Sequence, residues 1–259
     1  MFIISNLRKF SNIRGGINPP KGFVSKYAFA FTTDQVAPLR ISYIVGTQVR
    51  NIDTGEVVYT ATSTNNIGSQ ISSALPIGQY EIINPNPTSM WLLGTGVVSV
   101  DDWGDIDAGI YTHIRLQSCS RLTSVPYYLP HSITNMNNMF TGTTPFNQDI
   151  SNWDISNVTT MSQLFRGASS FNQYIGNWNT SNVTNMNNMF GNATSFNQDI
   201  GNWNTSNVTN MRAMFDSATS FNQNLSTWKV PKISSKPEYF DTGTTAWVKT
   251  GRQPRWGVA

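Results

Sequence analysis

A strict repeat of 25 residues is the feature that most constrains how this chain can fold. The neighbouring blocks SNWDISNVTTMSQLFRGASSFNQYI (151–175) and GNWNTSNVTNMNNMFGNATSFNQDI (176–200) agree at their aromatic, Asn, Met and Phe positions. One unit of this length cannot bury its own apolar side, whereas stacked units turn each repeated position into a continuous buried column. The repeat therefore predicts a solenoid.

Six apolar columns keep the spacing of 25 residues without an insertion. They contain Phe140, Phe165, Phe190, Phe215 and Phe240; Met136, Met161, Met186 and Met211; Trp153, Trp178, Trp203 and Trp228; Phe146, Phe171, Phe196 and Phe221; Ile133, Val158, Val183, Val208 and Ile233; and Ile150, Ile175, Ile200 and Leu225. From these columns we predict a repeat core that includes Phe140, Trp153, Phe165, Phe171, Trp178, Met186, Phe190, Phe196, Trp203 and Phe215.

Within each unit, the apolar spacing predicts a short strand or extended edge that runs into one or two helical turns. Val183 and Met186 are three residues apart, and Met189 and Phe190 follow. Such spacing is typical of a helical face, and we place the helical turn near residues 187–193. The expected fold class is therefore α+β: a small antiparallel β domain followed by a solenoid of 25-residue units, with a short strand and a short helical turn in each unit.

Polar residues also repeat in register. Asn157, Asn182 and Asn207 form one column, and Asn147, Asn172, Asn197 and Asn222 form another, beside Gln148, Gln173, Gln198 and Gln223. An amide side chain can both donate and accept hydrogen bonds, so such columns can satisfy buried backbone groups at corners. We favour this structural role, and a binding role for the amides that face solvent stays open.

The chain before the repeats has a different character. Short β-branched or aromatic runs at 26–31, 40–45, 56–62, 79–83 and 90–93 are separated by turn signals. This spacing predicts a small antiparallel sandwich over 23–96. Residues 1–22, with two Gly and two Pro in pairs, read as a basic arm or linker, and Arg8, Lys9 and Arg14 are candidate attachment residues.

The solenoid is expected to span 97–259. Residues 131–228 hold the regular units, while 97–130 and 229–259 depart from the consensus at either end. Atypical terminal units are characteristic of caps, which shield the exposed end of a stacked core from solvent. We therefore predict an N-terminal cap over 97–130 and a C-terminal cap over 229–259.

Charge is scarce and lies mostly outside the repeats. Only 12% of the 259 residues are Asp, Glu, Lys or Arg, and the +3 net charge comes from the two ends. A nucleic-acid-binding protein carries a basic stripe on its folded face. The repeats have no such stripe, which argues against nucleic acid as a partner. No run approaches the 18 apolar residues of a membrane span, and the first residues lack a secretory signal. We expect the protein to reach any exposed location without a signal of its own.

Candidate catalytic or metal-binding chemistry is sparse. Asp101, Asp102, Asp105 and Asp107 lie within seven residues and include enough oxygen ligands for a hard cation. Their spacing does not match an EF-hand, so a solvated turn is the favoured interpretation and no metal is predicted. Cys119 is the single cysteine, and no nucleophile motif or phosphate-binding loop is present. We predict no enzymatic activity and no cofactor.

Four sites match the Asn-x-Thr form of the N-glycosylation sequon, and two tryptophans stand among basic residues near the C-terminus. The sequons begin at Asn157, Asn182, Asn192 and Asn207. Three of them belong to the repeat consensus, which favours a structural role. Trp247 and Trp256 are expected to pack on the last rung, with contact to a sugar or protein as the alternative.

The motif FNQDISNWDISNVTTM and its copies, FNQDI followed by WNTSNVTNM, resemble the repeats of BspA-like leucine-rich-repeat surface proteins. The resemblance covers roughly residues 97–259. It includes the segment VDDWGDI at the start of the array and FDTGTTAWVKTGRQPRWG at its end. Such repeats occur in bacterial surface lipoproteins and adhesins and in some phage virion proteins. The resemblance implies adhesion and display, and it assigns no fixed functional residues.

Together these features predict a non-enzymatic structural or adhesion protein on the surface of a phage virion. The arm and β domain would bind other virion or surface proteins, and the solenoid would make weak contacts with a host-surface protein or glycan. A homo-oligomer on such an assembly stays open. The alternatives are an adhesin on a bacterial cell surface and, from a different class, a polysaccharide depolymerase.

Overall fold

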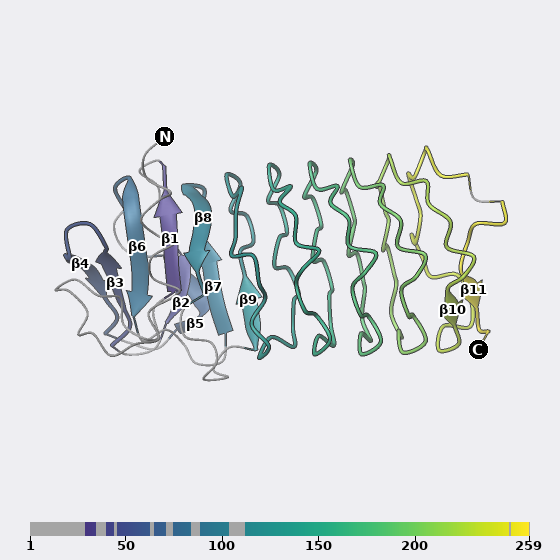
Figure 1. The fold of residues 1–259 in the computed structure, drawn as a ribbon, viewed down its shortest axis with the longest axis horizontal. Coiled ribbons are helices and arrows are strands. Elements are labelled where there is room, and N and C mark those ends of the chain that lie inside the picture. The colour runs from purple at the N-terminus through teal and green to yellow at the C-terminus, as the bar shows by residue number, and fades with distance from the viewer. Residues whose placement is uncertain are drawn as a thin grey trace.

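A computed structural model describes residues 29–34, 40–43, 46–62, 65–70, 75–83, 89–103, 112–248 and 250–258. Two layers of β-sheet lie at one end of the molecule, and a row of stacked coils extends from them to the C-terminus (Figure 1). The coils follow one another in chain order, so each coil contacts the coil before it and the coil after it.

The described residues contain eleven strands. They are β1 (Phe29–Thr33), β2 (Arg40–Tyr43), β3 (Gln48–Asn51), β4 (Val57–Thr60), β5 (Asn65–Gln70), β6 (Gly78–Ile83), β7 (Ser89–Leu93), β8 (Val97–Asp102), β9 (His113–Arg115), β10 (Lys229–Val230) and β11 (Arg255–Trp256). Each of the five runs predicted to be extended overlaps a strand. β3 and β5 were not expected, because their polar residues give no alternating apolar pattern.

The N-terminal strands form two sheets that share one core. The first sheet has the order β4-β3-β6-β1-β8 and is antiparallel throughout, and the second has the order β5-β2-β7-β9. Phe31 and Tyr80 of the first sheet stack with ring centroids 5.8 Å apart. They belong to the same buried cluster as Ile41 and Leu92 of the second sheet. Burial of apolar side chains from both inner faces holds the two layers together.

The sheets continue into the solenoid through hydrogen-bonded backbone. β9 pairs in parallel with β7, and His113 of β9 pairs in turn with Asn135 of the next coil. Parallel bridges then link Asn135, Thr160, Asn185 and Asn210, one coil after another. The second sheet is therefore connected to the coils by the same kind of pairing that joins the coils to each other.

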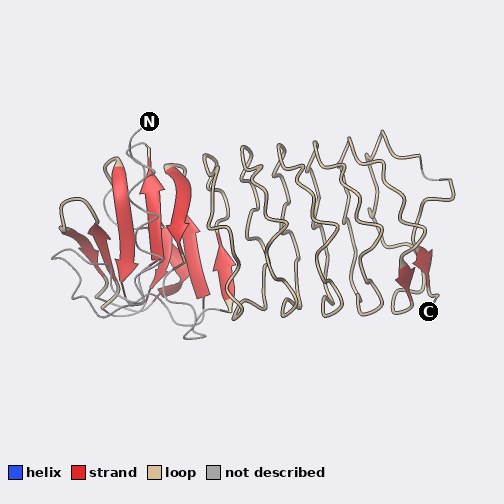
Figure 2. Ribbon diagram, in the orientation of Figure 1, coloured by secondary structure: helices blue, strands red, loops and turns tan. Residues whose placement is uncertain are grey.

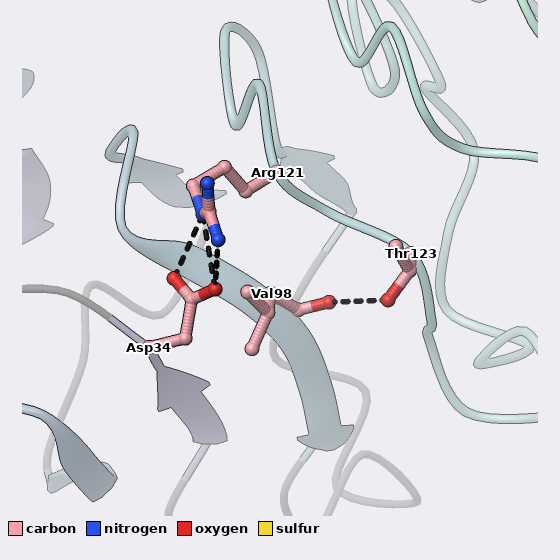
Figure 3. A network of polar contacts seen from close by, with 4 residues as sticks. All are labelled: Asp34, Val98, Arg121 and Thr123. Atoms are coloured by element: carbon pink, nitrogen blue, oxygen red, sulfur yellow. Dashed lines mark hydrogen bonds and ion pairs between the residues drawn. The ribbon is translucent and has the colours of Figure 1, made fainter.

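Side chains add a second connection between the sheets and the first coil (Figure 3). The guanidinium of Arg121 forms an ion pair with Asp34, the residue that follows β1, and its Nε lies 2.9 Å from Asp34 Oδ1. Thr123 Oγ1 donates to the carbonyl oxygen of Val98 in β8 at 3.1 Å. β8 thus belongs to the sheet and also contacts the coil, although the expected boundary between the two domains lies directly before it, at 96/97.

The predicted α+β class is wrong, because none of the described residues forms a helix (Figure 2). The segment 187–193, expected to be a helical turn, consists of successive turns. The amides of Asn188, Phe190 and Asn192 donate to carbonyl oxygens of the next coil, at 2.7–2.8 Å. The amides between them donate three residues back, as Gly191 does to Asn188. No amide of this segment is left for the bond four residues back that an α-helix needs.

Backbone dihedral angles enforce the same arrangement. Asn188 and Asn192 have φ values of 51° and 58°, in the left-handed region, and equivalent residues in neighbouring coils do the same. A right-handed helix cannot pass through such residues. Turns closed by a bond three residues back also place apolar residues three apart, which is why the sequence pattern resembles a helical face.

The ten predicted core residues all lie in the interior, each 4% exposed or less. Their rings form three ladders along the solenoid, one of which stacks Phe146, Phe171, Phe196 and Phe221 at 6.0–6.1 Å. Phe140, Phe165, Phe190 and Phe215 stack with centroids 5.5–5.8 Å apart and planes within 12°. Trp178, Trp203 and Trp228 stack at 6.1–6.5 Å. Each of these indoles donates its Nε1–H to a carbonyl oxygen 28 residues earlier, as Trp203 does to Ile175 at 3.0 Å.

The aromatic ladder ends where the repeat slips by one residue. Ala213 and Ser217 have left-handed φ values, and in the next coil the equivalent residues are Tyr239 and Gly243, which are 26 residues later. Asp241 therefore occupies the place of Phe215, and Phe240 meets Phe215 edge-on at 84° instead of extending the stack. Asp241 is 4% exposed, pairs with Lys236 at 2.5 Å and accepts a hydrogen bond from Gln253 at 2.7 Å. The tail then returns, and β11 pairs in parallel with β10 as a final rung.

Cys119 provides a chemical test of the junction between the sheets and the coils. Its thiol is completely buried and lies 3.3 Å from the carbonyl oxygen of Leu92 in β7. Burial raises the pKa of this thiol to about 12, so almost no reactive thiolate exists near neutral pH. We expect a water-soluble thiol reagent to label Cys119 in denaturant and to leave it unmodified in buffer. Rapid labelling of the native protein would contradict the burial of Cys119 at this junction.

His113 gives a second test, based on pH. Burial is the main cause that lowers the pKa of His113 below 6.5, partly opposed by its hydrogen bond to the carbonyl oxygen of Asn137. The unfolded chain then binds a proton at a higher pH than the folded chain, so the free energy of unfolding should fall as pH drops below about 6.5. In His113→Gln, the free energy of unfolding should fall less between pH 7 and pH 5 than in the wild-type protein. Urea denaturation at the two pH values measures this difference. His131→Gln, at an exposed position, is the control, and an equal effect of both variants would contradict the assignment.

Candidate functional site

Most polar columns of the solenoid are occupied by hydrogen bonds between coils. Asn172 Oδ1 accepts the backbone amide of Asn197 at 2.9 Å and the side-chain amide of Gln198 at 3.1 Å, and the same pattern recurs one coil on. Thr184 Oγ1 donates to the carbonyl oxygen of Thr159 at 3.1 Å. These side chains stabilise the stack, and their hydrogen-bonding groups are largely unavailable to a ligand.

The sequons divide into two kinds. The side-chain nitrogens of Asn157, Asn182 and Asn207 donate to carbonyl oxygens of the preceding coil, at 2.7–3.0 Å. Asn192 is exposed in a left-handed turn, and its backbone amide donates to the carbonyl oxygen of Asp216. Three of the four Asn-x-Thr asparagines are therefore structural.

The carboxylates of the array act as turn acceptors. Asp149 Oδ1 accepts the backbone amide of Ser151 at 2.9 Å, and Asp154 Oδ1 accepts that of Ser156 at 3.0 Å. The backbone amide and hydroxyl of Ser151 lower the pKa of Asp149, and the hydroxyl and backbone amide of Ser156 lower that of Asp154. A general acid in glycoside hydrolysis needs a raised pKa. The environment of these two carboxyl groups instead favours the ionised form.

Tyr174 interrupts this pattern of turn acceptors. Asp149, Asp199 and Asn224 occupy the equivalent position in other coils, and each accepts the amide two residues ahead. The Tyr174 ring instead lies against Gly176, where an added Cβ would be 2.8 Å from ring atom Cε2. The tyrosine is 48% exposed. A large aromatic side chain therefore stands where a small polar residue would complete the turn.

Tyr127 and Tyr128 form a second exposed aromatic feature, which the sequence did not predict. By repeat spacing they correspond to Asn152 and Trp153, so Tyr128 would be expected in the buried tryptophan column. Trp103 fills that place instead. It contacts Trp153 at 6.2 Å and donates its Nε1–H to the carbonyl oxygen of Tyr128 at 2.8 Å. The tyrosines point outward, 76% and 37% exposed, with ring centroids 5.3 Å apart.

The exposed tyrosines lie along one corner of the solenoid. The coil of Tyr127 adjoins the coil of Asp149, because Trp153 Nε1 donates to the carbonyl oxygen of Pro126 and Val125 bonds to Gln148. That coil adjoins the coil of Tyr174, because Asn177 Nδ2 donates to the carbonyl oxygen of Ser151 at 2.9 Å. We call the corner formed by Tyr127, Tyr128, Asp149, Asn152 and Tyr174 the tyrosine edge.

Of the four aspartates weighed as metal ligands, two lie in the described residues. Asp101 accepts hydrogen bonds from the hydroxyls of Thr32 and Ser99, each at 2.6 Å. Asp102 ends β8, whereas Asp105 and Asp107 lie outside the described residues, as do the candidate attachment residues Arg8, Lys9 and Arg14. Within the described ranges no group of three or more His, Cys, Asp or Glu side chains is placed to hold a metal ion.

The two C-terminal tryptophans pack against the end of the ladder. Trp247 is 5% exposed and meets Phe221 edge-on at 5.1 Å, while Trp256 meets Phe240 edge-on at 4.9 Å. Trp247 and Trp256 therefore pack on the last rung, as the sequence predicted. Tyr239 is the exposed ring at this end, with the guanidinium of Arg212 5.0 Å from its centroid.

Comparison with known proteins gives one match. Residues 130–249 match a family model described as a Mycoplasma protein of unknown function, DUF285. No curated protein and no solved structure matches the chain. The matched segment covers the regular coils and most of the C-terminal cap, and the family description names no activity. Across the described ranges, no helix is long and apolar enough to cross a membrane. The chain is thus similar, over its repeats, to a family without an assigned function.

Proposed function

We propose that the protein is a non-enzymatic structural and adhesion protein, displayed on the surface of a virion, whose solenoid contacts a host-surface protein or glycan. The observation that carries this proposal is the use of polar side chains in the coils. Asparagine, glutamine and threonine side chains hydrogen-bond to neighbouring coils, and aspartates hold turns. Such a stack is a stiff, nearly uncharged rod with few groups free for chemistry.

The display role fits the way in which the rod is terminated. At one end the coils join a two-layered sheet through parallel pairing, and at the other end edge-on rings and Asp241 interrupt the stack. A solenoid needs such caps to stay soluble, because an open ladder end would stack onto other molecules. The resemblance to BspA-like repeats is the support for the virion setting, since such repeats occur in some phage virion proteins. They occur on bacterial surfaces as well.

Mass spectrometry of purified virions tests the setting, combined with surface protease treatment of intact particles. We expect the chain in the particles and cleaved before the particles open, with the major capsid protein as the protected control. Absence from virions together with recovery from intact bacterial cells would assign the protein to the cell surface instead. Turnover of a capsular or cell-wall polysaccharide by the purified protein would contradict the non-enzymatic proposal.

A further inference from the structure

We infer that the tyrosine edge is a binding site for an extended neutral oligosaccharide, and this inference rests on the proposed adhesive function. Two of the three features that depart from the repeat in favour of an exposed aromatic, at Tyr127–Tyr128 and at Tyr174, lie on the same corner, and the third, Tyr239, lies at the C-terminal end. The repeat supplies small polar residues at the equivalent positions of other coils, such as Asn152 and Asp199. The fold therefore does not require the tyrosines.

The positions of the rings suit a chain of sugars. Tyr127 and Tyr174 are two coils apart, which corresponds to about 10 Å between their backbones along the solenoid axis, at a spacing of about 4.8 Å between paired backbone segments. The Tyr174 ring lies against Gly176, where an added Cβ would be 2.8 Å from Cε2 and 3.0 Å from Cζ, so this neighbour restricts the ring before a ligand binds. The C–H groups of a pyranose ring are slightly positive and pack favourably on the negative face of an aromatic ring. A tyrosine also loses little side-chain entropy when it binds.

The groups between the rings are suited to hydroxyl recognition. Asp149 has a lowered pKa, and the amide and hydroxyl of Ser151 occupy only part of the acceptor capacity of its two carboxylate oxygens, so it can accept a hydrogen bond from a sugar hydroxyl. Asn152 is exposed beside it and offers both a donor and an acceptor. The carboxylate would repel an anionic polymer, which favours a neutral glycan.

A protein partner fits this corner less well. The cores of protein interfaces are contiguous, desolvated and poor in charge. Here separate rings alternate with an amide and a carboxylate along one corner of a polar surface. Such an alternation of ring and polar group matches a ligand that itself alternates C–H faces and hydroxyls.

Substitution back to the repeat consensus tests the site without disturbing the fold. Tyr127→Asn introduces the residue found at Asn152, Asn177 and Asn202, and Tyr174→Asp introduces the residue found at Asp149 and Asp199. Tyr239→Asn is the matched control, because it removes an exposed tyrosine at the far end and introduces the residue found at Asn138 and Asn188 in the same left-handed position.

The probes are dextran, laminarin, mannan and chitohexaose, with heparin as the anionic comparison, measured by affinity electrophoresis and calorimetry. We expect the full-length protein and Tyr239→Asn to bind at least one neutral probe and not heparin. The affinity of the double variant Tyr127→Asn/Tyr174→Asp for that probe should be lower by at least about tenfold. Unchanged binding by the double variant, an equal loss in Tyr239→Asn, or no binding of any neutral glycan on a broad array would overturn the inference.

Adhesion to intact host cells separates this inference from the proposed function. If the wild-type protein adheres and the double variant adheres equally well, or if adhesion survives periodate oxidation of the cell-surface glycans, the adhesive function stands and the glycan site is wrong. If the wild-type protein does not adhere, the adhesive function fails, and the glycan array still decides the site.

Discussion

Trp178→Ala is expected to lower the free energy of unfolding by ~3–5 kcal/mol, as for other buried aromatic truncations. Trp178 is 4% exposed and stacks on Trp203 with planes 4° apart, and its Nε1 donates to the carbonyl oxygen of Ile150 at 3.2 Å. The substitution removes a ring from the middle of the ladder and leaves that carbonyl without its indole donor. Neighbouring coils cannot close the gap, because their own rings are held by the same stack.

Thermal and urea denaturation followed by circular dichroism measure this effect. Trp178→Phe keeps a ring and loses the donor, so it should cost less than the alanine variant. Asn202→Ala, at an exposed position of the same corner, should change stability by less than about 0.5 kcal/mol. A silent Trp178→Ala would mean that the tryptophan column does not hold the coils together.

The second large effect is expected at the C-terminal cap, where a carboxylate takes the place of a ladder phenylalanine. Lys236→Met would leave the buried Asp241 with Gln253 as its remaining side-chain partner among the bonds described above. Removal of one partner from a fully buried ion pair costs about 3–5 kcal/mol. The Lys236 side chain is 40% exposed, so water screens the pair and we expect a smaller loss, of about 1–3 kcal/mol.

The double variant Lys236→Met/Asp241→Leu should regain most of that loss, because an apolar pair of similar size needs no charge compensation. Urea denaturation of the two single variants and the double variant forms a thermodynamic cycle. Arg212→Met is the control: it breaks the exposed pair between Arg212 and Glu238 and should change stability by less than about 1 kcal/mol. Equal losses in Lys236→Met and the double variant would show that the charge pair is not what matters at this position.

The sequence predicted the columns of the solenoid because the same side chains recur at a fixed spacing. That recurrence alone is enough to predict which rings stack and are buried. It led to the wrong secondary structure within each coil. The residues in left-handed conformations include Asn188, Gln163 and Ala213 as well as glycines, so no glycine pattern marks them. The bonds that exclude a helix also run between coils and are invisible to any window along the chain.

Two features of the ends could not be read from the repeat. The slip of one residue that places Asp241 in the ladder position is not visible in the sequence. Phe240 lies 25 residues after Phe215 and so looks like the next member of that column. The outward turn of Tyr128 depends on Trp103, which lies 25 residues earlier and fills the core in its place. Tyr174, in contrast, departs from the repeat in the sequence itself, where Asp149 and Asp199 hold the equivalent positions.

An electron cryomicroscopy reconstruction of the protein in its native assembly would show whether the solenoid is displayed. We expect a rod that is anchored near its N-terminal sheets and projects from a virion surface, with the tyrosine edge uncovered. A reconstruction in which the solenoid is buried between other subunits, with Tyr127 and Tyr174 covered by protein, would contradict it.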